Sequence, residues 1–372
     1  MLFRSALVEK SQFPRRKVCG EFLSGTSLPL LREIGVAEAY LNLAGPEVQR
    51  VGLYAGDAVL MAPMPRTANG AAGWGRALGR EHLDSLLLQQ VRAADVHVQQ
   101  PARVTSLRRD GDRHLARIAS DSGETELAAK LVIAAHGSWE RSPTQANVPP
   151  HRESDLLAFK AHFTGADMPP GVMPLLAFPG GYGGLVHTDS GRVSLSCCIR
   201  RGVLRNLRAR NAGASAAEVV IQHIRETTRG VANALTPANL AGAALAAGPI
   251  RPGIRARYRD GIFFVGNAAG EAHPIVAEGI GMGMQSAWLL ARILSSYESP
   301  VTVTRACEGA GRTYSRQWRT AFAPRIRAAS FFAHLALSPA ATSTALHVLQ
   351  RFPALITWGA RLSGKASQLV PA

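Results

Sequence analysis

Apolar residues in the first 150 positions fall into short runs separated by polar segments. The runs at 6–8 and 131–134 have the length of buried strands. Between 80 and 94, apolar side chains recur with the period of an amphipathic helix, whose apolar face is Leu83, Leu86, Leu87 and Val91. Residues 51–61 have the pattern of a hairpin around Gly56 and Asp57. This part of the chain therefore mixes strands and helices.

The pattern changes near residue 150 and changes back near residue 250. Between these positions it is mostly that of strands. A buried strand at 261–265, a glycine-rich loop and a helix at 279–294 follow, and the tail from about 304 is helical. A strand–helix framework interrupted by an antiparallel sheet predicts an α/β fold in which one part binds a nucleotide and the other covers it.

We divide the chain into four parts on this basis. The nucleotide-binding part comprises 1–150, which includes a small β insert near 48–75, and a return segment at 251–300. The covering part is 151–250, and 301–372 forms a helical C-terminal region.

Composition narrows the class of protein. Lys and Arg number 42 against 26 Asp and Glu, which gives a net charge of +16, but these basic residues are scattered and do not alternate with aromatics. We therefore expect a solvated basic surface and no nucleic-acid partner. Four cysteines without framework spacing favour a reducing cytoplasm, and no metal-ligand spacing occurs. The apolar stretches at 331–337 and 342–358 are too short to span a membrane, although they suit a peripheral contact.

The segment 261–287 carries the strongest chemical signal. It reads Gly-Ile-Phe-Phe-Val-Gly-Asn-Ala-Ala-Gly, then Glu-Ala-His-Pro-Ile-Val-Ala-Glu-Gly-Ile-Gly-Met-Gly-Met-Gln-Ser-Ala. A strand that ends in a polar residue and feeds a glycine-rich helix start is how α/β folds present a ligand site. The glycines allow close backbone approach, and the helix N-terminus favours negative charge.

This segment resembles the second FAD-binding motif of flavoproteins with the para-hydroxybenzoate hydroxylase fold, in particular the geranylgeranyl reductase-like branch. In that family the strand is followed by Gly-Asp-Ala-Ala, and Asn267 stands where the Asp contacts the ribityl chain. The resemblance implies that Gly279, Ile280 and Gly281 present their backbone to the flavin ring.

Four further positions agree with the resemblance, which implies that each contacts FAD. Glu9 ends a strand, as does the acid that accepts the ribose hydroxyls. Lys17 lies in the distinctive loop Phe-Pro-Arg-Arg-Lys-Val-Cys-Gly-Glu-Phe-Leu-Ser. Arg80 opens a helix that resembles the family's Arg-x-x-Leu-Asp start, whose Arg reaches the phosphates. Val104 matches a position whose backbone meets the adenine.

Two residues are candidates for catalysis on the same grounds. Cys19 lies where relatives place a cysteine near the flavin, and a buried structural role is the alternative. Tyr182 lies in Phe-Pro-Gly-Gly-Tyr-Gly-Gly-Leu-Val, which is similar to the segment lining the substrate side of the flavin. Its four glycines would leave room for a flat ligand, or simply form a tight turn. His136 stands where the family has Asp, which puts a nicotinamide role there in doubt.

The family begins with a strand, Gly-x-Gly-x-x-Gly and a helix, about 30 residues before the acid matched by Glu9. Only eight residues precede Glu9 here, so we expect an N-terminally truncated FAD-binding Rossmann-like, three-layer domain. The resemblance implies an FAD-dependent oxidoreductase with NAD(P)H as reductant. Its lipophilic or aromatic, polyketide-type substrate would be hydroxylated or would have a double bond reduced. The alternative is a non-catalytic remnant that has lost tight FAD binding.

Overall fold

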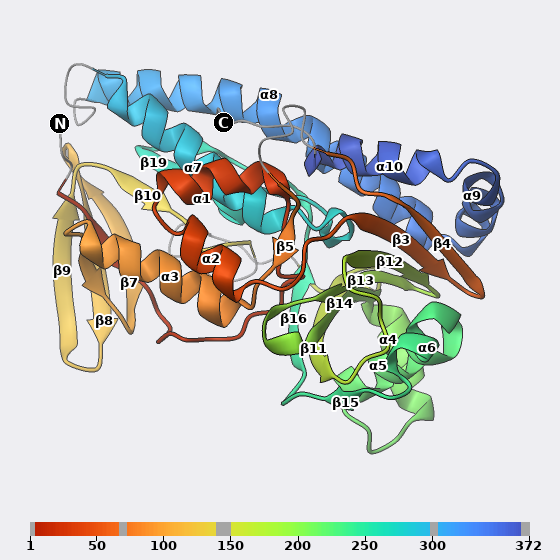
Figure 1. Ribbon diagram of the computed structural model, residues 1–372. Coiled ribbons are helices and arrows are strands. Elements are labelled where there is room, and N and C mark those ends of the chain that lie inside the picture. The colour runs from red at the N-terminus through yellow and green to blue at the C-terminus, as the bar shows by residue number, and fades with distance from the viewer. Residues whose placement is uncertain (1–3, 67–72, 139–149, 298–303, 366–372) are drawn as a thin grey trace.

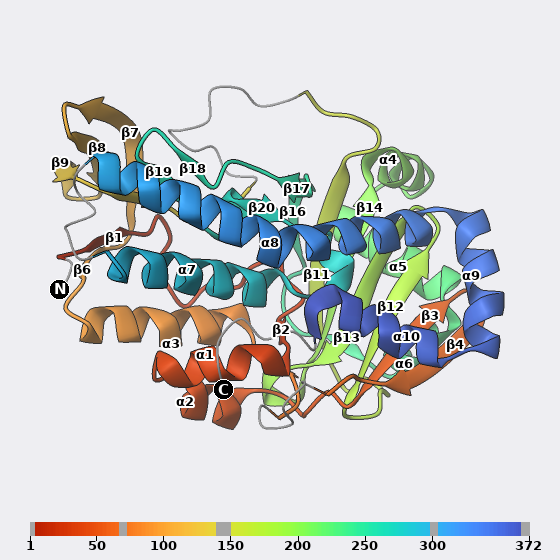
Figure 2. The ribbon, with the colours of Figure 1, turned by 90° about the horizontal axis from the view of Figure 1, so that it is seen from above.

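The computed structural model describes residues 4–66, 73–138, 150–297 and 304–365. Figure 1 shows two regions side by side, one built from helices over short parallel strands and the other from a large sheet backed by helices. One long helix of the C-terminal half, α8 (Thr304–Leu337), runs across both regions, as the view from above shows (Figure 2).

Two short parallel pairings form the centre of the first region. β1 (Ala6–Val8) pairs with β6 (His97–Gln99), and β10 (Val132–Ala134) pairs with β19 (Ile262–Phe264), which also pairs with β18 (Tyr258–Arg259). Within the described ranges these are two separate sheets. Helix α3 (Arg80–Ala93) follows β5 (Arg76–Ala77) and leads into β6.

A core of buried side chains joins β19 to the long helices. Phe263 lies fully buried among Tyr314 and Phe322 of α8 (Thr304–Leu337) and Leu290 of α7 (Gly279–Ser295). An antiparallel sheet of β7 (Ala102–Asp110), β8 (Arg113–Ser120) and β9 (Gly123–Ala129) lies at the far end of this region (Figure 1).

The second region is an eight-stranded sheet. Its strands are β11 (Leu156–Thr164), β12 (Val172–Phe178), β13 (Gly181–His187), β14 (Val193–Arg200), β15 (Asn239–Leu240), β16 (Leu245–Ile250), β3 (Arg50–Ala55) and β4 (Ala58–Pro63). Neighbouring strands run antiparallel, except that β12 pairs in parallel with β3. Strands far apart in sequence therefore share one sheet.

Helices cover one face of this sheet. The covering helices are α4 (Arg201–Arg210), α5 (Ala216–Thr227) and α6 (Arg229–Leu235), whose apolar residues pack on β11 and β14 (Figure 1). The remaining short elements are β2 (Phe22–Leu23), η1 (Gly25–Ser27), α1 (Leu28–Glu33), α2 (Ala37–Leu43), η2 (Asp189–Gly191), β17 (Gly253–Ile254), η3 (Gly266–Ala268), β20 (Gly270–Glu271) and η4 (Pro274–Val276). The chain continues from α8 into α9 (Pro339–Arg351), α10 (Ala354–Ala360) and η5 (Arg361–Lys365).

The structure confirms the predicted fold class, an α/β arrangement with an antiparallel sheet and a helical C-terminal region. Of the two alternatives left open for the segment around Tyr182, the structure shows the tight turn, at residues 179–180 between β12 and β13. The glycine-rich segment around Tyr182 is mostly strand β13, and its space is filled by the chain itself. A Cβ on Gly181 would lie 2.2 Å from Phe178, and one on Gly183 would lie 2.6 Å from the Ser196 carbonyl oxygen. These two glycines therefore allow close strand packing and leave no room for a flat ligand. No described helix is long and apolar enough to cross a membrane.

Candidate functional site

The N-terminus of helix α7 is open. The first bond inside the helix runs from the Met282 amide to the Glu278 carbonyl, so the amides at 279–281 precede it and have no helical acceptor. Glu278, at the N-cap position, makes no side-chain cap. A Cβ added to Gly279 would meet no atom within 4 Å, whereas one on Gly281 would lie 3.0 Å from Ser27 Oγ. Donors and free space therefore coincide at this helix end.

The loop after β19 packs closely against the same helix. Gly266 has φ of +58°, and a Cβ on it would lie 3.7 Å from the Cα of Gly283. The Gly266 amide donates to Ser286 Oγ (2.7 Å), which in turn donates to the Gly283 carbonyl (2.9 Å). Glycine at both positions brings η3 against the backbone of α7, so Asn267 is held beside the helix end.

Asn267 is paired with a carboxylate that the sequence analysis did not identify. Its Nδ2 donates to Oε1 of Glu271 over 3.2 Å, and its carbonyl accepts from Arg255 (3.0 Å). Burial raises the pKa of Glu271, while Ser138 and Arg255 act in the opposite direction without cancelling it. The amide at 267 therefore acts as a neutral donor to a buried acid.

Three of the predicted residues meet around Asp84. Arg80 binds it through Nε and Nη2 (2.8 and 2.9 Å), and Lys17 Nζ lies 2.7 Å from Oδ2. Although burial acts to lower it, the pKa of Arg80 is raised by Cys19 and Asp84. Cys19 Sγ also accepts from the Glu21 amide (3.4 Å). The Asp84 carboxylate thus faces two cations, Lys17 and Arg80, so this cluster carries a net positive charge.

A buried charged group, absent from the sequence analysis, lies next to this cluster. Glu21 binds Lys160 through one carboxylate oxygen and His162 Nε2 (2.9 Å) through the other, and all three side chains have no exposed surface. Burial raises the pKa of Glu21, but the hydrogen bond from His162 and the charge of Lys160 outweigh it and hold the pKa at about 2. The available signal was a lysine and a histidine within the apolar strand 156–163.

The protonation of His162 follows from its neighbours. Guanidinium nitrogens of Arg16 and Arg192 both lie 3.2 Å from Nδ1. Because arginine only donates, Nδ1 is the acceptor, and the ring proton is on Nε2, which donates to Glu21. The group thus joins the loop at 16–21 to strand β11 of the large sheet.

Glu9 and Val104 belong to neighbouring elements at the junction of β1 and β7. Glu9 follows β1, and its carbonyl accepts from the Ala102 amide (2.9 Å) at the start of β7, the strand that contains Val104. The Glu9 carboxylate accepts from the Ser11 amide (2.9 Å). These two residues therefore share one end of the β1–β7 junction.

Tyr182 is only 1% exposed. Its hydroxyl lies 3.0 Å from His273 Nδ1, and burial is the main cause that raises its pKa well above the ordinary value. The pKa of His273 is lowered to about 4, mainly by burial and then by His334. The buried phenol thus contacts a half-buried histidine.

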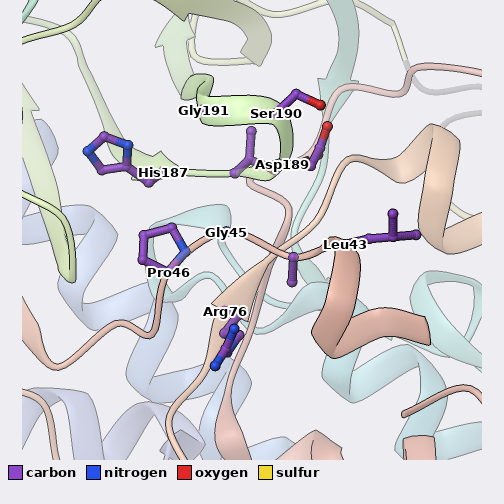
Figure 3. A pocket seen from close by; sticks show the side chains of 10 residues that line it. Leu43, Gly45, Pro46, Arg76, His187, Asp189, Ser190 and Gly191 are labelled. Atoms are coloured by element: carbon purple, nitrogen blue, oxygen red, sulfur yellow. Dashed lines mark hydrogen bonds between the residues drawn. The ribbon is translucent and has the colours of Figure 1, made fainter. Parts of the chain in front are cut away.

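The described residues also form a cavity of about 260 Å³. One of its lining residues, Asp189, accepts from the Gly79 amide and binds Arg192, the arginine that also contacts His162. It lies between the segment 43–46 and the turn 187–191, with Arg76 nearby (Figure 3). None of the predicted cofactor-binding residues lines it.

Glu81, His82 and Asp189 lie close enough to one another to hold a metal ion. However, Arg192 binds both Glu81 (3.0 Å) and Asp189, so a guanidinium already balances these carboxylates.

Comparison with known proteins identifies the family. Residues 3–300 match the model of a family described as FAD binding domain. The chain belongs to this FAD-binding family. Its membership establishes FAD as the cofactor class, and no curated protein matches the chain.

Solved structures share the fold at low sequence identity. The flavin-dependent brominase Bmp2 is 18% identical, with a TM-score of 0.73 over 96% of this chain and 86% of the other. CmlS, a flavin-dependent halogenase, is 17% identical, with a TM-score of 0.71 over 97% and 67%. A probable FAD-dependent monooxygenase from Pseudomonas aeruginosa is 18% identical, with a TM-score of 0.66 over 95% and 92%.

The described residues fit a flavin at the end of α7. Ser27 Oγ is buried there without a hydrogen-bond partner, and Gly20 and Gly279 both border open space. A buried polar atom without a partner is rare in a folded protein unless a ligand or water satisfies it. The amides of α7 and the Asn267 side chain would hold the cofactor at this end.

Proposed function

We propose that the chain is an FAD-dependent oxidoreductase that uses NAD(P)H and hydroxylates a lipophilic or aromatic, polyketide-type small molecule. The observation that carries the proposal is the open N-terminus of α7, where free amides, the unpartnered Ser27 hydroxyl and the space beside Gly279 coincide. The reducing cytoplasm is the compartment that four free cysteines support.

The protein's own residues would position the cofactor and control charge around it. Bound FAD would supply the two-electron oxidation and reduction chemistry. The α7 amides would donate to negative charge at the helix end, and Gly279 would allow the backbone to approach closely. Lys17 and Arg80 carry one positive charge in excess of Asp84, which suits the cofactor's phosphates.

Two observations bear on the reaction. The brominase, halogenase and monooxygenase that share the fold support oxidation. The loop 13–24, which resembles the geranylgeranyl reductase-like branch, supports reduction of a double bond instead. Substrate-dependent oxygen consumption separates the two, since only hydroxylation consumes oxygen stoichiometrically with product.

One observation favours the alternative of a remnant without tight FAD binding. β1–β6 and β10–β19 are separate sheets among the described residues, so no strand there connects the two halves of the parallel framework. A loosely held framework would weaken any site built across it.

The decisive experiment is an absorbance spectrum of the purified chain, followed by titration with FAD. Flavin bands that remain with the protein after gel filtration support the oxidoreductase. A colourless protein that stays colourless with added FAD overturns it in favour of the remnant.

A further inference from the structure

Large apolar side chains are exposed at the C-terminal end of the molecule. Phe331 is 61% exposed, Phe352 59% and Trp358 55%. Three aliphatic residues of the same C-terminal segment are also exposed, and we call the whole set the C-terminal apolar face: Phe331, Val348, Phe352, Leu355, Trp358 and Leu362. Figure 1 shows the supporting helices α8, α9 and α10 along one edge of the molecule.

The helices that carry this face are only partly packed. Helix α9 has no buried residue, and every residue from Arg351 to Leu355 is exposed. Helix α10 buries Ile356 and Ala360 in a cluster with residues of β3 and β4. The opposite side of this segment carries Leu355, Trp358 and Leu362 at helical spacing. These three side chains are exposed because the helix turns its other side, with Ile356 and Ala360, toward the protein.

Two contacts fix the position of the face. A Cβ on Gly359 would lie 3.5 Å from the Phe332 ring, so α10 packs on α8 there, and Phe331 stacks against Phe332 with ring centroids 5.7 Å apart. At the end of η5, which follows α10, Lys365 Nζ donates to the Val276 carbonyl oxygen and lies 3.3 Å from Glu278 Oε1. The helices that carry the face are therefore anchored, although its side chains are not covered.

The tail that carries the face is basic. The sequence contains no Asp or Glu after Glu308, whereas eight Lys and Arg follow it. Arg327, Arg351 and Arg361 are exposed and lie within four residues of a member of the face. Arg312, Arg316 and Arg319 are also exposed but lie toward the other end of α8. Apolar and aromatic residues bordered by arginine are the composition of a helix that lies in the interface of an anionic membrane.

We propose that the C-terminal apolar face docks on the surface of an anionic lipid bilayer. Phe352 and Trp358 would enter the headgroup region, and Arg351 and Arg361 would meet lipid phosphates. A second copy of the chain is the poorer occupant, because a symmetric contact would bring the same arginines and no acidic residue from either tail together. The protein would lie on the membrane, since no described helix can cross it.

Vesicle co-sedimentation of the full chain tests this proposal. We expect binding to phosphatidylcholine vesicles that contain phosphatidylglycerol, weaker binding to phosphatidylcholine alone, and release by salt. The variant Phe352→Ser/Trp358→Ser should partition at least about tenfold less, because each ring loses its apolar burial. Arg351→Gln/Arg361→Gln should lose only the preference for anionic lipid.

The matched control is Leu43→Ser/Leu240→Ser, which changes two equally exposed leucines, 45% and 48%, outside the face. It should bind vesicles as the unchanged chain does. Equal circular-dichroism melts for all variants would show that the fold is retained. The proposal is overturned if the unchanged chain ignores anionic vesicles. It is also overturned if the aromatic variant binds them equally well, or if sedimentation shows a dimer that this variant abolishes without any lipid binding.

Discussion

Asn267 donates a hydrogen bond to the buried acid Glu271: the side-chain amide nitrogen of Asn267 lies 3.2 Å from a carboxylate oxygen of Glu271. The family motif places an acid at the first position, and here the buried acid is found four residues later. An Asp at position 267 would place a second negative charge beside Glu271, whereas the amide of Asn267 is neutral and can donate to it. The neighbouring acid therefore explains why this position holds Asn.

Asn267→Asp should therefore destabilise the protein at neutral pH, by about 1–3 kcal/mol for a lost buried hydrogen bond. The pKa of the Glu271 carboxyl is raised in the folded state. Its contribution to the free energy of unfolding is therefore largest below the ordinary carboxyl pKa and is lost as the pH rises through the folded pKa. Thermal melts should show the defect shrinking as the pH falls from neutral toward the ordinary carboxyl pKa. The double variant Asn267→Asp/Glu271→Gln should recover most of the loss, and a defect independent of pH would contradict this reasoning.

Gly279→Ala should weaken FAD binding without weakening the fold. The added methyl group meets no protein atom, and Ala is the better helix former by about 0.5–1 kcal/mol. We expect about tenfold weaker binding in a fluorescence titration, equivalent to about 1.4 kcal/mol, and an unchanged or higher melting temperature. Gly359→Ala in α10 is the matched helical control. If both variants bound FAD with equal affinity, the proposed position of the flavin at the end of α7 would be wrong.

Arg80→Ala should also weaken FAD binding, because it removes the excess positive charge beside Asp84. A charge-assisted hydrogen bond contributes about 1.5–3 kcal/mol, so the dissociation constant should rise at least about tenfold. Asp84→Asn leaves both cations and should keep or raise the affinity, most clearly at low salt. Unchanged flavin content in Arg80→Ala would exclude a phosphate-binding role.

Cys19→Ser should leave FAD bound, since a hydroxyl can still accept from the Glu21 amide. If the thiol takes part in catalysis, turnover should fall while flavin content stays constant. Stopped-flow reduction and steady-state turnover measure the two effects separately. Turnover equal to that of the unchanged chain would assign Cys19 a structural role beside Arg80.

Lys160→Met should destabilise the protein by about 3–5 kcal/mol, because it leaves Glu21 buried without its cation. Glu21→Gln added to that variant should restore part of the stability, since the amide oxygen still accepts from His162. Arg205→Met, which breaks the exposed pair with Glu153, should cost at most about 1 kcal/mol. Additive losses in the double-mutant cycle would contradict the coupling.

The contribution of the Glu21–Lys160 pair to stability changes with pH in the opposite direction to that of Glu271. The pKa of Glu21 is depressed from 4.5 to about 2 in the folded state. Its contribution is therefore present above about pH 4.5 and is lost as pH falls toward about 2. Acid unfolding of the unchanged chain should steepen in that window, and the variant Glu21→Gln should lack the steepening.

The sequence predicted local structure well and contacts between distant segments poorly. The α7 motif was recognisable because its strand, glycines and helix start are consecutive, and the structure places Gly279 and Asn267 at one helix end. The Glu21–Lys160 pair was missed because its partners are 139 residues apart, and only the paired strands of the large sheet bring them together. The burial of Tyr182 could not be read from the sequence, because burial by a neighbouring strand leaves no local pattern.

The parallel pairing of β3 with β12 has a consequence for biosynthesis. Val51 is in register with Met173, so the hairpin of β3 and β4 finds its neighbour only after more than a hundred further residues have been added. At roughly 5–20 residues per second, the hairpin leaves the ribosome many seconds before its partner strand does. During translation its exposed edge is open to pairing with other nascent chains. Production in a cell should therefore depend on chaperones that shield that edge, more than on the stability of the finished protein.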